Sequence, residues 1–153
     1  MNWEGHVINA LPPVADAYES GPNYTDVIDA QGGGVLFILY EGVGTTGTVT
    51  LTVSACDNTT PSNRTAIPFI YRINTGTDVW GAWTAATTDG FITTAGSNHV
   101  YQVWVDPSEI AEESSRGYVE MTLTEGADAA VLAGVLAIVM NPRYQVQTGS
   151  LID

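Results

Sequence analysis

The chain has 153 residues, of which four are basic and 17 acidic, giving a formal net charge of −13. All four basic residues are arginines, so electrostatics disfavour both a nucleic-acid ligand and an anionic membrane surface. Hydrophobic residues make up 44% of the chain, which is ordinary for a single folded domain and argues against global disorder.

The single cysteine, Cys56, excludes an internal disulfide and a cysteine-based zinc site, and we expect it to be a small buried side chain. The first residues lack the basic segment and apolar stretch of a secretory signal. The longest apolar run, residues 129–140, is shorter than the roughly 20 residues that span a bilayer. We therefore expect a soluble protein that folds in a reducing compartment.

Short strands separated by turn residues account for most of the chain. Residues 35–40 are an apolar run between glycines, typical of a buried strand. Residues 48–55 alternate polar and apolar side chains, which predicts a strand with its valines and leucine inward. After a loop at 56–63, we expect further strands at residues 67–73, 79–85, 90–94, 100–105, 118–124 and 129–140.

One helix signal interrupts these strands. Asp106 is a suitable N-cap, Pro107 suits the first helical position, and Glu109 stands at the capping-box position. We expect a short helix near residues 107–113. Its acidic residues, Glu109, Glu112 and Glu113, are interpreted as a solvated face rather than a metal site.

Strands at this spacing predict an all-β fold, an antiparallel β-sandwich or barrel rather than an α/β fold. Charge and glycine are spread evenly, so we expect no second domain. We divide the chain into an extended N-terminal arm (residues 1–22), the sandwich (23–144) and a C-terminal tail (145–153).

The apolar run at residues 129–140 fits either a buried helix or a strand covered on both faces. The neighbouring β elements favour the strand. One row would then be Val131, Ala133, Val135, Ala137 and Val139, and the other Leu132, Gly134, Leu136, Ile138 and Met140. Because both rows are apolar, we expect both to be covered, the second by another subunit.

The sequence carries little that points to catalysis. Residues 42–47 match G-x-G-x-x-G, but a strand follows instead of the helix that a dinucleotide site needs, so we interpret the glycines as a hairpin connection. No nucleophile elbow, zinc-protease motif or calcium loop is present. We expect no enzymatic activity, no cofactor and no metal.

Two tryptophans, Trp80 and Trp83, stand three residues apart, so they do not share one face of a regular strand. Either one faces outward or the strand bulges at Gly81. We place Trp104 in the core, and expect Arg72 to pair with an acid of its own domain. The acidic surface fits either adaptation to high salt or a basic partner.

Four segments in chain order carry a resemblance to a known class of proteins. They are residues 48–55 with the Asp57-Asn58 turn, 100–107, 116–124 and 137–144. Over residues 30–146 this pattern of strands and turns resembles small virion structural proteins of tailed bacteriophages, particularly capsid decoration (cement) proteins.

The resemblance implies a single antiparallel β-sandwich that is jelly-roll-like and noncatalytic. Such a protein binds the outer capsid surface in many copies, stabilises the shell, and is made in the cytoplasm of a bacterial host. The resemblance also implies two partners, the major capsid protein and further copies of the chain, as a trimer or dimer. A neck, tail or fibre-attachment protein and a carbohydrate-binding β-sandwich using Trp80 or Trp83 are the alternatives. The residues expected to contact a partner are Trp3, Leu11, Trp80, Trp83, Arg143 and Tyr144.

Overall fold

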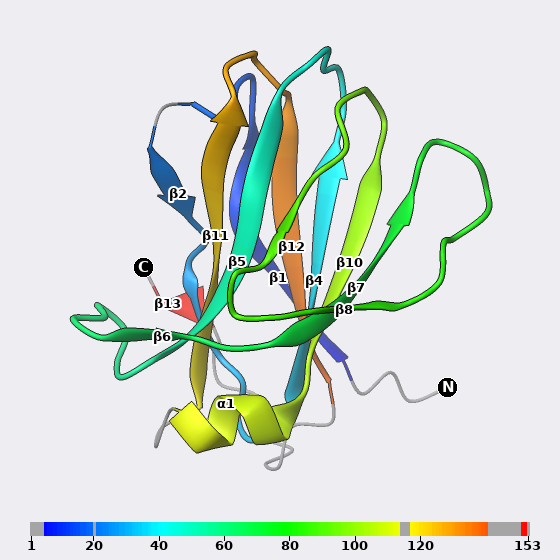
Figure 1. The fold of residues 1–153 in the computed structure, drawn as a ribbon. Helices are drawn as coiled ribbons and strands as arrows, with labels where there is room; N and C mark the ends of the chain where they lie inside the picture. The colour runs from blue at the N-terminus through cyan, green and yellow to red at the C-terminus, as the bar shows by residue number, and fades with distance from the viewer. Residues whose placement is uncertain (1–4, 20, 114–116, 141–150, 153) are drawn as a thin grey trace.

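The computed structural model describes residues 5–19, 21–113, 117–140 and 151–152. It shows two antiparallel β-sheets packed face to face, with one short helix across an end of the sandwich (Figure 1). The expected all-β antiparallel sandwich is therefore confirmed. No helix among these residues has the length and hydropathy needed to cross a membrane.

Six strands form sheet A: β1 (Gly5–Val14), β4 (Gly34–Glu41), β7 (Phe69–Asn74), β8 (Thr84–Ala86), β10 (Val100–Val105) and β12 (Ala133–Met140). Sheet B contains β2 (Pro22–Tyr24), β3 (Val27–Asp29), β5 (Thr48–Cys56), β6 (Arg64–Ala66), β9 (Phe91–Ile92), β11 (Tyr118–Ala127) and β13 (Leu151–Ile152).

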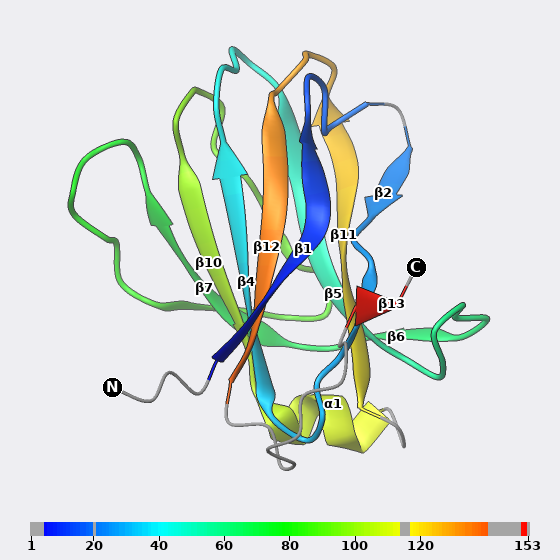
Figure 2. The same cartoon turned by 180° about the vertical axis from the view of Figure 1, so that it is seen from behind.

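The strand order shows how distant parts of the chain meet. Sheet A runs β1-β12-β4-β10-β7-β8, and sheet B runs β13-β3-β11-β5-β6, with β2 added to β11 and β9 to β5. The chain alternates between the sheets from β3 to β5 and again from β10 to β12. This alternation is consistent with a jelly roll. Figure 2 shows β12 lying between β1 and β4.

The core lies between the two sheets and is built from alternate residues of each strand. Phe37 and Leu39 of β4 face Leu51 and Val53 of β5 across this space, and all four are fully buried. The expected inward row of residues 48–55 is confirmed. Cys56 is also buried, as expected, and burial raises the pKa of its thiol to about 12.

The expected helix is present as α1 (Pro107–Glu113). The Asp106 carboxylate accepts hydrogen bonds from the backbone N–H and the hydroxyl of Ser108, so Asp106 caps the helix as expected. These hydrogen bonds hold the pKa of Asp106 below its usual range. Ile110 is buried and anchors α1 to the end of the sandwich.

The ambiguous apolar run is a strand over Ala133–Met140. Its first row, from Val131 to Val139, is buried in the core as expected. Its second row faces outward, and Leu136 is 44% exposed. The expected cover of this second face is therefore not supplied by the described part of the chain.

Two other expectations need correction. Residues 79–85 are not one strand, because residues 75–83 form a loop and only Thr84–Ala86 pairs with β7. Residues 42–47 are not a hairpin connection, because they cross from β4 in sheet A to β5 in sheet B. The glycines allow this crossing to pack tightly: a Cβ on Gly47 would collide with the Ala129 carbonyl oxygen.

The described residues of the expected N-terminal arm are largely extended and belong to the sandwich. β1 pairs with β12, and β2 pairs with β11. Ile8, Ala10 and Tyr18 are buried in the core. Residues 5–14 therefore form an edge strand of sheet A.

Candidate functional site

The outer side of sheet A carries a row of apolar side chains that runs across the whole sheet. One row of opposed residues crosses all six strands in sheet order and is wholly apolar: Val7, Ile138, Leu36, Trp104, Ile70 and Ala85. The next row is Asn9, Leu136, Ile38, Gln102 and Arg72. We call these two rows, together with Tyr40, the apolar face.

Several side chains of the apolar face are well exposed. Val7 is 55% exposed, Tyr40 57%, and Leu136 44%. Trp104, expected in the core, instead lies on this outer side and is half-buried. Its indole covers Gly34, where a Cβ would collide with the ring. The indole therefore occupies the space that a side chain at Gly34 would fill on the neighbouring strand.

The apolar face is also almost free of charge. The six strands of sheet A contain one acidic residue, Glu41, which points into the core and is 1% exposed. Arg72 is the charged residue on the outer side of these strands. In a chain with 17 acidic residues, this sheet presents no carboxylate on its outer side.

Arg72 is enclosed by the two tryptophans of the loop at residues 75–83. Its guanidinium carbon lies 4.7 Å from the ring centroid of Trp80 and 4.6 Å from that of Trp83. Its Nε donates a 2.7 Å hydrogen bond to Gln102 Oε1. These cation–π contacts replace the expected pairing with an acid, and they cover the charge.

The loop that carries the tryptophans extends from the β7–β8 edge of sheet A (Figure 1). A 2.9 Å hydrogen bond from the Gly81 N–H to the Ile73 carbonyl holds the loop to β7. Trp83 is 43% exposed and Val79 is 72% exposed. The two predicted contact residues Trp80 and Trp83 are thus brought together beside the apolar face.

The remaining predicted contact residues are not part of this arrangement. Leu11 lies in β1 opposite Val135 and packs against the core, so most of its surface serves the interior. Trp3, Arg143 and Tyr144 lie outside the described residues.

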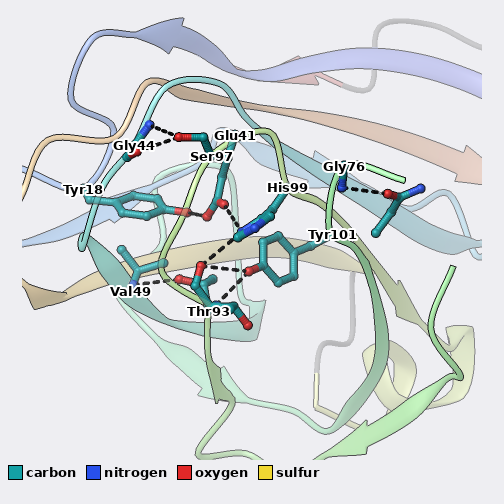
Figure 3. A network of polar contacts seen from close by, with 11 residues as sticks. Tyr18, Glu41, Gly44, Val49, Gly76, Thr93, Ser97, His99 and Tyr101 are labelled. Carbon is teal, nitrogen blue, oxygen red and sulfur yellow. Dashed lines mark hydrogen bonds and ion pairs between the residues drawn. The ribbon is translucent and has the colours of Figure 1, made fainter. Parts of the chain in front are cut away.

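A buried polar network, which the sequence did not reveal, lies at the end of the sandwich where β4 ends and β10 begins (Figure 3). The Tyr18 hydroxyl donates a hydrogen bond to Glu41 Oε1. His99 Nδ1 lies 3.2 Å from Glu41 Oε2 and 3.1 Å from the Thr94 carbonyl oxygen. Since Glu41 Oε2 accepts no well-aligned hydrogen bond, His99 Nδ1 is better paired with Thr94.

Burial governs the electrostatics of this network. It raises the pKa of Glu41, although the contacts with Tyr18 and His99 oppose the shift. It also raises the pKa of Tyr18, and that of Tyr101 to about 12. No member of the Tyr18, Glu41 and His99 trio is more than 7% exposed. These side chains are therefore not accessible to a substrate, and their contacts stabilise this end of the sandwich.

A second buried acid lies on sheet B. Glu120 is 1% exposed and pairs with the Arg64 guanidinium, which also stacks over the Tyr24 ring at 4.5 Å. Burial raises the pKa of Glu120, while Arg64 opposes that shift. This cluster fastens β6 and β2 to β11.

A pocket of about 280 Å³ lies between the apolar face and α1. Its lining includes Ile70, Ala85 and Trp104 of the apolar face, and Asp106 and Glu109. Because the Asp106 carboxylate already caps α1, this pocket does not present a free pair of carboxylates.

The described ranges contain no group of three or more histidine, cysteine or acidic side chains able to hold a metal ion. Comparison with protein-family models and with curated proteins finds no match for this chain. The apolar face and its tryptophan loop are therefore the feature from which a function is inferred.

Proposed function

We propose that this chain is a noncatalytic structural protein of a tailed-phage virion that binds the outer capsid surface and stabilises the shell. The observation that carries the proposal is the apolar face, bordered by Trp80 and Trp83. Exposed apolar patches on this scale mark sites of protein association. The resemblance over residues 30–146 supplies the virion as the setting.

The tryptophan loop is the part we assign to the capsid protein. Trp83 is held against Arg72, so little conformational entropy is lost when a partner covers it. Tryptophan and arginine are enriched among residues that dominate binding energies. Many such contacts on a regular lattice give strong attachment even where each one is weak.

Quantitative mass spectrometry of purified particles tests the proposal. We expect this chain at a copy number close to that of the major capsid protein. A few copies per particle would move the chain to the neck, tail or fibre attachment, and absence would reject a virion role.

A substitution in the tryptophan loop tests the contact itself. Trp83→Ala should weaken capsid binding about tenfold or more, as expected for an aromatic anchor. Ile92→Ala is the matched control, because Ile92 is an exposed apolar residue of sheet B, 68% exposed. Equal occupancy of added capsids by both variants would reject the loop as the contact.

A carbohydrate-binding module is the second candidate, favoured by the paired indole rings on an exposed loop. Sugars stack on aromatic faces, but Arg72 already occupies one face of each ring. Tryptophan fluorescence titrated with oligosaccharides distinguishes the two functions, since the capsid role predicts no response.

A further inference from the structure

We infer that the apolar face is where a second copy of this chain binds, so that the protein forms a closed symmetric oligomer through the outer side of sheet A. The inference takes from the proposed function the assignment of this face to protein binding, and names the partner.

Electrostatics favours a second copy as the occupant. Two chains that each carry a net charge of −13 repel one another over most of their surfaces. The outer side of sheet A is different, because its strands expose no carboxylate and the guanidinium of Arg72 is covered by Trp80 and Trp83. A basic partner would be attracted by acidic side chains, which this face does not offer.

The pattern of the face also suits self-association. In a symmetric pair the same surface is presented by both subunits, so it must be complementary to itself. The row of opposed residues from Val7 to Ala85 is apolar on every strand, and therefore meets a copy of itself without an unpaired charge. Asp106 and Glu109 line a pocket together with Ile70, Ala85 and Trp104, so carboxylates do lie beside one end of this row.

The dimensions are sufficient for a specific interface. A strand spacing of about 4.8 Å makes the six-strand row about 24 Å wide, and the strands of six to eight residues, β4, β7, β10 and β12, extend about 20–26 Å. The projected area is on the order of 500 Å². Covering this area on both copies buries about 1,000 Å² in total, the lower end of the range for a specific interface.

The mass of the purified full-length chain, measured by light scattering during size exclusion, tests the inference. We expect two or more times the 16.2 kDa of one chain. Raising NaCl from about 50 mM to about 500 mM should strengthen the assembly, because salt screens repulsion between acidic copies and leaves apolar contact intact. A monomer at every salt concentration would overturn the inference.

Leu136→Glu places a carboxylate in the second row of the face, on β12, and should yield monomers with an unchanged circular dichroism spectrum. Ile92→Glu makes the same kind of change on sheet B, and should leave the wild-type mass. If both variants keep the wild-type mass, the interface lies elsewhere and the inference is wrong. If Leu136→Glu loses the β-sheet spectrum, Tyr40→Glu, at a more exposed position of the face, takes its place and should also dissociate the assembly.

This test is independent of the virion. A monomer found at high copy number on capsids would overturn the inference and leave the proposed function standing. An oligomer absent from particles would do the opposite.

Discussion

Glu41 shows how one buried side chain sets a condition on stability. Its carboxylate lies among Tyr18, His99 and the end of β4, with one oxygen bonded to Tyr18 and the other lacking a well-aligned hydrogen bond. Burial of a carboxylate favours its neutral form. Glu41 therefore binds a proton more tightly in the folded chain than in the unfolded chain.

The pH dependence of unfolding should report this difference. The stability that Glu41 confers is fully present below its ordinary pKa of 4.5, and is lost as the pH rises through the higher pKa of the folded state. Glu41→Gln keeps an acceptor for the Tyr18 hydroxyl and cannot ionise. The variant should therefore gain stability relative to the wild type between acidic and neutral pH.

Urea unfolding of both proteins from pH 4.5 upward measures the effect. Glu120, Asp57 and Asp106 also have shifted pKa values, but they are present in both proteins and their contributions cancel. Parallel pH profiles for wild type and variant would contradict the assignment to Glu41.

Contacts between individual side chains were the hardest feature to predict from the sequence. Glu41 ends an apolar strand and Tyr18 lies 23 residues earlier, so no spacing rule joins them. Trp104 was wrongly placed in the core. Residues 100–105 carry apolar side chains on both faces of the strand, so their alternation does not show which face lies inward. Gly34, which has no side chain, leaves room for the indole on the outer side of the sheet.

Single elements were predicted best where one local signal sufficed. The alternation in residues 48–55 gave a strand with the correct inward row, and the cap at Asp106 gave the helix at its observed bounds. Strands were missed where their pairing depends on segments that are far away in the sequence. β1 and β6 are strands because β12 and β5 offer them free edges, which no local pattern reveals.

The helix cap offers a test at this scale. Asp106→Ala removes the acceptor for the Ser108 N–H, and should lower the free energy of unfolding by about 1 kcal/mol. Asp106→Asn is the control, since asparagine caps about as well as aspartate. Chemical denaturation at neutral pH compares the two, and an equal loss in both would show that the negative charge, not the cap, is what matters.

For the whole molecule, the distribution of charge decides behaviour in solution. A net charge of −13 on one small domain opposes compaction, because like charges are closer together in the folded chain. Added salt should therefore raise the urea midpoint. The Leu136→Glu variant, expected to be monomeric, separates this effect from self-association.

The salt series should run from about 20 mM to about 500 mM NaCl, which spans strong to weak screening. An unchanged midpoint would mean that repulsion between the acidic groups does not measurably destabilise the folded chain. The net charge can be counted from the sequence, but only the fold shows that the strands of sheet A carry no carboxylate on their outer side.

The place of β12 has a consequence for how the protein can be divided. β12 lies between β1 and β4, although the chain reaches it only after both have been made. A chain shortened before Ala133 would leave one edge of β4 free for pairing, and β1 would lose its strand partner. A separate peptide of residues 133–140 matches the β12 position in length and register, as in donor-strand complementation. The protein is thus a natural candidate for a split reporter, reassembled from a body and one added strand.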